Sequence, residues 1–253
     1  MTDVLVDVQH DDGIRTLTLD SPANRNALSE RLLAQLEYAL RDATSDPDVR
    51  AVVLTGTGTV FCSGADLSER GSAAPIRMPA ILTAIVESAV PVIVRVNGHA
   101  RAGGLGLVAA ADMSVAAEAA TFAFTEVRVG VAPAMILVPA LRVVDRRFLA
   151  RATLTGERFT ASEAAAAGLL TAVTPDEVAL DAWVAAQTAA LRRSAPGAVR
   201  ATKQLLRSLS AQSWADGLAA AAITSAELFV GAEAAEGMDA FLQKRRPSWD
   251  TNA

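Results

Sequence analysis

The sequence predicts an α/β fold that is followed by a helical C-terminal third. Up to Pro175, short apolar runs typical of buried strands alternate with Gly-containing loops and with segments of helical spacing. After Pro175, segments of helical spacing follow one another and no strand pattern recurs. We therefore expect a core of residues 1–193 and a C-terminal helical region of residues 194–253.

The first predicted elements are a hairpin and a helix. Residues 4–8 and 14–19 are expected to form strands, because apolar side chains recur in both and Asp11-Asp12-Gly13 between them is a turn signal. Ser29 is a suitable cap for a helix with partly helical apolar spacing, which should end at Asp46-Pro47-Asp48.

The rest of the predicted core alternates strands and helices. Each strand is a short apolar run. In chain order the expected elements are a strand at 51–55, a helix at 78–89, a strand at 91–96, a helix at 105–111, a strand at 113–116, a helix at 161–168 and a strand at 169–173. The helical third should comprise helices at 176–193, 196–210, 214–231 and 233–244.

Composition and charge exclude several classes of function. The net charge is −5 and only 4% of residues are aromatic, so we expect no nucleic-acid binding. The longest uncharged run, residues 51–65, is too short to cross a membrane. A lone cysteine, Cys62, excludes an internal disulfide, and together with the acidic N-terminus it predicts a cytoplasmic protein. The mean hydropathy of +0.29 suggests apolar surface buried between subunits.

Familiar catalytic and metal motifs are absent from the sequence. The only histidines are His10 and His99, both interpreted as structural, so a serine or cysteine triad lacks a base. No His, Cys and Asp residues have the spacing of metal ligands. Gly104 and Gly106 fit a dinucleotide fingerprint, but seven residues separate Val96, the end of a strand, from Gly104. We expect no metal ion and no nucleotide cofactor.

Two glycine loops and one acid are better candidates for chemistry. The loops, residues 56–65 and 97–106, each follow a predicted buried strand, and one backbone N–H from each could bind a single oxygen as an oxyanion hole. The alternative is that both are tight turns. Glu126 lies in a largely apolar stretch, where a raised pKa would suit proton transfer. Its alternatives are an ion pair with Arg128 or a surface position.

The sequence resembles the enoyl-CoA hydratase/isomerase, or crotonase, superfamily nearly from end to end. The residues that carry the resemblance are SPANRNAL at 21–28, FCSGADL at 61–67, VNG at 96–98, GG at 103–104, AD at 111–112, FTE at 124–126 with Gly130, and GMDAFLQKRRP at 237–247. The resemblance implies a spiral of ββα units in a catalytic core, followed by a helical trimerisation region. It also implies a homotrimer or a hexamer of paired trimers.

The resemblance further implies a site for an acyl-CoA thioester, with an enolate held at the thioester oxygen. Ala65 and Gly103 would supply the two N–H donors, and Glu126 would be the acid/base. The CoA-binding residues would be Arg25, Ala27, Ala65, Asp66, Leu67, Ser68 and Gly103, with Arg25 near the nucleotide end. Coenzyme A is part of the substrate, so no separate cofactor is expected.

One departure from the family pattern affects the expected reaction. Hydratases of the family typically carry a second Glu three residues after the oxyanion glycine, where this chain has Gly106. We expect a hydratase-like addition of water to a 2-enoyl-CoA. The alternatives are a Δ3–Δ2 enoyl-CoA isomerase that uses Glu126 as its single base, and a non-catalytic acyl-CoA-binding protein. Arg101 could support the enolate, recognise a polar acyl chain, or be a solvated loop residue.

Overall fold

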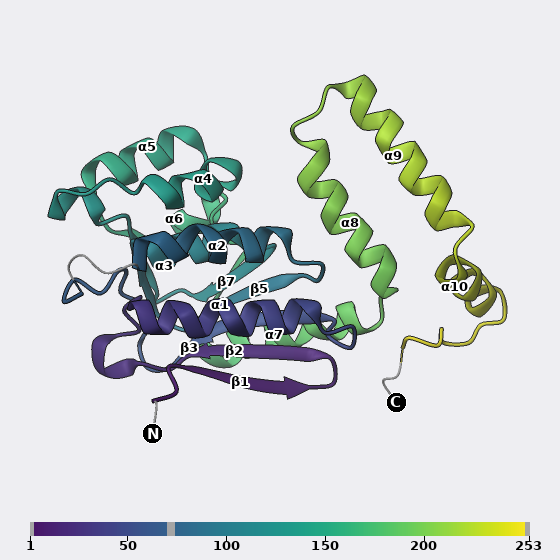
Figure 1. Cartoon of the computed structure of the whole chain (residues 1–253), viewed down its shortest axis with the longest axis horizontal. Helices are drawn as coiled ribbons and strands as arrows, with labels where there is room; N and C mark the ends of the chain where they lie inside the picture. Colours follow the sequence, from purple (N-terminus) through teal and green to yellow (C-terminus); the bar gives the residue numbers. More distant parts are fainter. Residues whose placement is uncertain (1–2, 70–73, 251–253) are drawn as a thin grey trace.

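The computed structural model describes residues 3–69 and 74–250. A six-stranded sheet lies at the centre of its core (Figure 1). The strand order is β1-β2-β3-β5-β7-β10. All neighbouring strands are parallel except β1 and β2. The strands are β1 (Val6–Asp11), β2 (Ile14–Leu19), β3 (Ala51–Gly56), β5 (Val92–Val96), β7 (Met113–Ala117) and β10 (Ala172–Thr174). The predicted α/β class is therefore confirmed.

The predicted hairpin is present, with β1 shifted toward the turn. Asp12 and Gly13 connect its strands with φ values of 43° and 74°, as a two-residue turn with two left-handed positions requires. The strand expected at 169–173 is wrong in its bounds. Leu169 and Leu170 are buried in a connection, and β10 begins only at Ala172.

A second, smaller sheet has the strand order β4-β6-β8-β9. Its members are β4 (Val60–Cys62), β6 (His99–Arg101), β8 (Thr121–Ala123) and β9 (Phe159–Thr160). None of the four is predicted from the sequence, because strands of two or three residues are too short to show a periodicity. The chain passes from β3 to β4, from β5 to β6 and from β7 to β8, each time continuing into a helix. This repeat is the ββα spiral that the resemblance implied.

Helices cover both faces of the large sheet. On one face α1 (Glu30–Ser45) buries Leu32, Leu36 and Leu40, and Ser29 Oγ caps it by accepting from Leu32 N at 3.2 Å. The other helices on this side are α2 (Ala74–Glu87), α3 (Gly103–Ala110), α4 (Ala134–Val143), α5 (Arg146–Thr155) and α6 (Ala161–Ala166). The sequence patterns predicted no element at α4 and α5, and the predicted starts of α2 and α3, residues 78 and 105, are too late.

The opposite face of the sheet is covered by α7 (Glu177–Arg192). Alternation along β3 explains its continuous apolar run: Val52 and Leu54 join the main core, whereas Val53 packs in a second cluster with Trp183 of α7. A strand that is buried on both faces needs apolar residues at every position. The large sheet is therefore a rigid platform, and the loops at its strand ends carry the candidate site.

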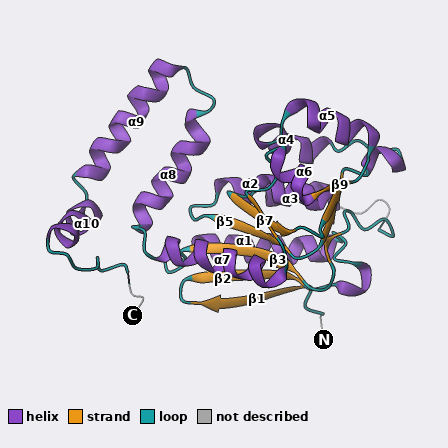
Figure 2. Cartoon of the chain, turned by 180° about the vertical axis from the view of Figure 1, so that it is seen from behind, coloured by secondary structure: helices purple, strands orange, loops and turns teal. Residues whose placement is uncertain are grey.

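The last helices form an arm that extends away from the sheet (Figures 1 and 2). They are α8 (Pro196–Leu209), α9 (Trp214–Phe229) and α10 (Ala232–Leu242), each within two residues of its predicted bounds. Among the described helices, none is by itself long and apolar enough to cross a membrane. The helices α9 and α10 reach that length only together, as a pair bent by 64°.

Candidate active site

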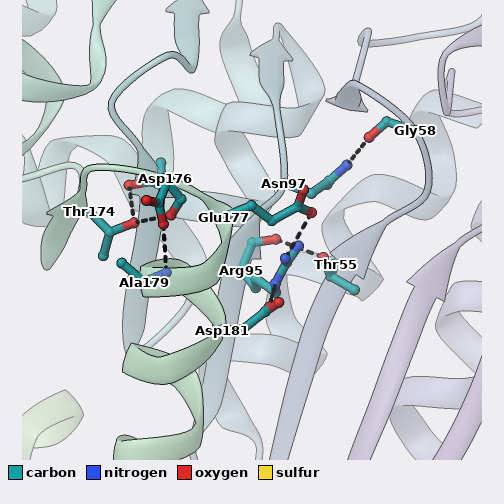
Figure 3. A network of polar contacts seen from close by, with 10 residues as sticks. Thr55, Gly58, Arg95, Asn97, Thr174, Asp176, Glu177, Ala179 and Asp181 are labelled. Atoms are coloured by element: carbon teal, nitrogen blue, oxygen red, sulfur yellow. Dashed lines mark hydrogen bonds and ion pairs between the residues drawn. The ribbon is translucent and has the colours of Figure 1, made fainter.

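The two glycine loops lie against each other at the ends of β3 and β5 (Figure 3). Asn97 Nδ2 donates to Gly58 O at 2.7 Å, and Thr55 Oγ1 donates to Arg95 O at 2.9 Å. A Cβ atom on Gly98 would lie 2.0 Å from Thr59 O, so this close approach requires glycine. The loops predicted from spacing to act together are therefore physically joined.

A charged contact holds this end of the sheet to α7. The guanidinium of Arg95 binds Asp181 at 2.6 Å and Glu177 at 3.0 Å (Figure 3). These carboxylates lie on successive turns of the helix, so one side chain contacts both. The contact positions β5, from which the second glycine loop departs.

Buried Asn26 shapes the first glycine loop. Its Nδ2 atom donates to Val60 O at 2.8 Å and to Thr57 O at 3.0 Å, while its Oδ1 atom accepts from Ser21 N. These bonds satisfy a side chain that has no exposed surface. They place residues 26–28 beside the loop, where Leu28 and Ala65 form an isolated parallel bridge.

The second glycine loop turns sharply into α3 at Ala102. This residue has φ 46° and ψ −121°, a conformation that costs a non-glycine residue about 1–3 kcal/mol. Its amide donates to Ala123 O at 3.0 Å, which holds the turn against β8. Gly103 is then the first residue of α3, where helical amides have no partner within the helix.

The amides of Ala65 and Gly103 are available to a ligand. Neither donates a hydrogen bond within residues 3–69 and 74–250. Both residues line one cavity of about 210 Å³ between the loops, α2 and α4. The described residues around it are Leu28, Leu33, Ala65, Met78, Ala102, Gly103, Glu126, Val131, Ala132, Pro133, Ala134, Met135 and Ile136. We call this space the reaction cavity.

Glu126 alone carries a polar side chain among the described residues of the reaction cavity. It begins the short helix η2 (Glu126–Val129), which follows β8 after a connection of two residues. Its Oε2 atom is buried and has no hydrogen-bond partner in the described part of the chain. Burial raises the pKa of Glu126, since an apolar setting disfavours the charged form.

The ion pair considered for Glu126 is not formed. Arg128 instead donates from Nε to Thr155 O at 3.4 Å, and no described residue forms a salt bridge with Glu126. Glu126 therefore lines the cavity without an ion-pair partner in the described part of the chain. The structure brings together the three residues that the resemblance assigned to catalysis, Ala65, Gly103 and Glu126.

Ile136 occupies the space where a side chain at position 106 would lie. A Cβ atom on Gly106 would be 2.4 Å from Ile136 Cγ2 and 3.3 Å from Met78 Cε. A second carboxylate cannot enter there without displacing Ile136. The role of Ile136 was not predicted, because no pattern in residues 133–150 indicates that they lie near Gly106.

The residues assigned to CoA binding lie mostly outside the reaction cavity. Arg25 and Leu67 are exposed, and Ala27 is buried beside the Leu28–Ala65 bridge. Ser68 donates to Asp66 Oδ1 from its Oγ at 2.6 Å and from its backbone N at 3.0 Å. These bonds lower the pKa of Asp66. Of the seven residues, only Ala65 and Gly103 line the cavity.

Arg101 does not line the reaction cavity, so it is not placed to support an enolate there. Its guanidinium donates to Thr121 O and, at 2.8 Å, to Thr121 Oγ1 and to Ala100 O. His99 is tied to the same residue, since Thr121 N donates to its Nδ1 at 3.1 Å. Burial lowers the pKa of His99, and Arg101 and Arg158 add to the effect. Both side chains are half-buried parts of the small sheet.

Cys62 and the possible metal ligands provide no further chemistry among the described residues. Cys62 is fully buried, and burial raises the pKa of its thiol to about 12, which makes it unreactive. No group of three or more His, Cys, Asp or Glu residues in the described ranges has the arrangement of a metal site.

Comparison with known proteins extends the likeness over nearly the whole chain. Residues 9–252 match the family model described as enoyl-CoA hydratase/isomerase. The chain is 34% identical to the 2,3-dehydroadipyl-CoA hydratase of Escherichia coli, over 92% of this chain and 93% of that protein. It is also 34% identical to the mitochondrial enoyl-CoA hydratase domain-containing protein 3 of Danio rerio, over 94% of this chain and 84% of that protein.

The fold is shared with solved structures as well. An enoyl-CoA hydratase of Mycobacterium smegmatis superposes with a TM-score of 0.93 at 35% identity, covering 98% of this chain and 100% of the other. This agreement confirms the predicted crotonase-type fold.

Proposed function

Because the chain belongs to the enoyl-CoA hydratase/isomerase family, we propose that it binds an enoyl-CoA thioester and stabilises its enolate. The amides of Ala65 and Gly103 donate to the thioester oxygen, and Glu126 moves the proton. One observation carries the proposal: Ala65 and Gly103, whose amides donate to no described residue, line the same otherwise apolar cavity as Glu126, whose Oε2 has no described partner. Arg25, Ala27 and residues 66–68 then lie on the path of the CoA moiety, outside that cavity.

A proton shift is the reaction that this geometry supports best. In a 3-enoyl-CoA, the Glu126 carboxylate takes a proton from C2, and the negative charge moves onto the thioester oxygen. The protonated Glu126 returns the proton to C4, and the double bond ends between C2 and C3. A single acid/base therefore carries out both proton transfers. A raised pKa suits a group that must both take up and release the proton.

The filled position at Gly106 favours this reaction over hydration. Hydration needs a water oxygen bonded to C3, a base that takes the water proton, and a proton delivered to C2. Ile136 occupies the place of a second carboxylate, and apolar side chains make up the rest of the wall around Glu126. Water has few partners in such a cavity.

Hydration is the second candidate because the names of the two relatives described above include the word hydratase. In that case Glu126 takes the proton from water and then delivers it to C2. The double variant Gly106→Glu/Ile136→Gly tests this alternative, since it supplies a second carboxylate together with the space for it. Gly106→Glu alone should lose activity, because the new side chain would collide with Ile136.

Matched 2-enoyl-CoA and 3-enoyl-CoA substrates of equal chain length, followed by mass spectrometry in D₂O, test the proposal directly. A 3-enoyl-CoA converted to the 2-enoyl isomer, without gain of water, supports the proton shift. Gain of water by a 2-enoyl-CoA instead identifies a hydratase. Binding of a saturated acyl-CoA without turnover of either substrate would refute both reactions and identify a non-catalytic acyl-CoA binder.

We also propose that the arm mediates self-association, as a trimer or a hexamer of paired trimers. Large apolar side chains of α9 and α10 are exposed in the single chain, among them Ile223, Phe229 and Phe241. Exposed apolar residues concentrated on two neighbouring helices are typical of an interface between subunits.

A further inference from the structure

The two residues that precede the proposed oxyanion donors pack against each other. The N–H of Ala65 belongs to the peptide that begins at Gly64, and the N–H of Gly103 belongs to the next loop's corresponding peptide, which begins at Ala102. A Cβ atom on Gly64 would lie 2.8 Å from Ala102 Cβ, so the methyl group of Ala102 already occupies the space beside Gly64. The two glycine loops are therefore in contact through this methyl group, directly beside both amides.

A backbone hydrogen bond fixes the direction of each of these peptides. Gly64 O accepts from Leu28 N at 2.8 Å. Ala102 O accepts from Leu105 N, also at 2.8 Å. In a trans peptide the carbonyl and the N–H point in opposite directions, so each bond also sets the direction of the amide that follows. Both amides of the reaction cavity are therefore oriented by bonds that the protein makes without a ligand.

Ala102 holds a backbone conformation that alanine disfavours. Its φ of 46° and ψ of −121° lie outside the regions that residues with a side chain usually adopt, whereas glycine reaches them freely. Its amide bond to Ala123 O, at 3.0 Å, and its carbonyl bond to Leu105 N hold it there. Strain of this kind persists only where the surroundings over-determine the conformation, and it is concentrated at functional sites. The strained alanine therefore indicates a role for its methyl group.

We propose that Ala102 is a positioning residue of the oxyanion hole. Its methyl group, seated against Gly64, sets the separation of the two amides, and its backbone conformation sets the direction of the Gly103 N–H. The inference rests on the proposed function, because it assumes that both amides donate to one thioester oxygen. Such donors stabilise an enolate best when their directions are fixed before the charge develops. In Ala102→Gly the same loops would have more freedom to separate and to rotate.

The test observes the thioester carbonyl directly. Butyryl-CoA labelled with ¹³C at the carbonyl carbon is bound to the protein, and its C=O stretch is recorded by difference infrared spectroscopy. Two hydrogen bonds to the oxygen weaken the C=O bond, so in the wild type we expect a lower frequency than in water. In Ala102→Gly we expect a smaller shift and a broader band. The dissociation constant from calorimetry should stay within about twofold of wild type, because alignment of the donors matters most in the transition state.

Turnover and stability separate positioning from simple packing. With the substrate that the wild type converts, kcat of Ala102→Gly should fall by about tenfold and KM should stay within about twofold, a smaller loss than the roughly 10²–10³-fold for removal of a whole donor. The melting temperature should rise by about 2–4 °C, because the disfavoured backbone conformation is relieved. A methyl group that only packs would lower the melting temperature on removal and leave the carbonyl band unchanged.

Two further variants control for strain and for the position of the methyl group. Asp12→Gly relieves a similar φ of 43° in the turn before β2, at the opposite end of the sheet, and should leave the carbonyl band and kcat at wild-type values. Gly64→Ala/Ala102→Gly moves the methyl group to the other loop, where the nearest atom besides the removed Cβ is 3.5 Å away. This double variant should regain part of the lost infrared shift.

Two results would overturn the inference and leave the proposed function intact. One is a wild-type carbonyl band and a wild-type kcat in Ala102→Gly, which would show that the amides are aligned without the methyl group. The other is a folded double variant with no recovery of the infrared shift. Failure of the wild type to bind butyryl-CoA, or binding without any shift of the carbonyl band, would instead refute the proposed function, and the inference with it.

Discussion

The core and the arm bury apolar side chains to very different degrees. In the core, α1 alone buries Leu32, Leu33, Leu36 and Leu40 together with two alanines. In the described arm helices, the buried residues are Lys203, Gly217 and Ala240. Since apolar burial is the main source of folding free energy, the core can support itself, whereas the arm needs further contacts.

Polar contacts hold the arm to the core. Lys203 of α8 reaches between α2 and β5, where its Nζ binds Asp112 at 2.6 Å and donates to Ile85 O and Val90 O. Within the arm, Glu233 accepts from the amide of Gly197 at the start of α8. This contrast fits the separate tasks that we propose for the two regions, with chemistry in the core and assembly in the arm. Substitutions in each should therefore affect different measurements.

The largest effect is expected for Glu126→Gln in the core. Loss of the acid/base should lower kcat/KM by about 10²–10⁴-fold, the usual contribution of such a group. Binding of butyryl-CoA and the assembly mass should stay at wild-type values, because the amide has nearly the same shape. Steady-state kinetics, calorimetry and light scattering check the three parts. Wild-type turnover in the variant would remove Glu126 from the mechanism.

The next largest effect is expected for Lys203→Ala in the arm. It leaves the Asp112 carboxylate without its partner in a partly buried place, which should lower the free energy of unfolding by about 3 kcal/mol. Denaturant unfolding measures the change. The control is Lys203→Met/Asp112→Asn, in which both charges are absent, and it should recover most of the loss. An equal loss of unfolding free energy in the double variant would show that the charge pair is not what holds the arm to the core.

A smaller effect is expected for Phe241→Asp on α10. Its side chain is 83% exposed in the single chain, and a charge there should weaken subunit association by about 2 kcal/mol if it lies in the interface. Sedimentation at a series of concentrations measures this, with Tyr38→Asp on α1 as the exposed core control. Tyr38→Asp should keep the wild-type assembly. A wild-type assembly in Phe241→Asp would place the interface elsewhere.

The smallest effect concerns the pH dependence of stability. Burial raises the pKa of Glu126 in the folded protein above its ordinary value of 4.5. The contribution of this shift to the free energy of unfolding is fully present below the unfolded pKa, and it is lost as pH rises through the folded pKa. A Gln side chain does not titrate, so it has no such loss. Glu126→Gln should therefore have the same melting temperature as the wild type at pH 4 and a higher melting temperature than the wild type at pH 8. A difference that is the same at both pH values would show that burial does not raise this pKa.

The sequence alone determined the elements that depend on local pattern. The Asp12-Gly13 turn, the Ser29 cap and the apolar run of β3 each act through neighbouring residues, so their signals lie within a few positions of the chain. The arm helices were predicted for the same reason. The residues that carry the family resemblance also identified Ala65, Gly103 and Glu126, which line one cavity in the structure.

Only the tertiary structure decided how those residues are enclosed. Ile136 fills the space over Gly106 although thirty positions separate them, and no periodicity reports a contact between distant side chains. The same holds for Arg101 bound to Thr121 and for the short strands of the small sheet. Packing and pairing across the chain set these features, because each depends on a partner that the local sequence does not specify.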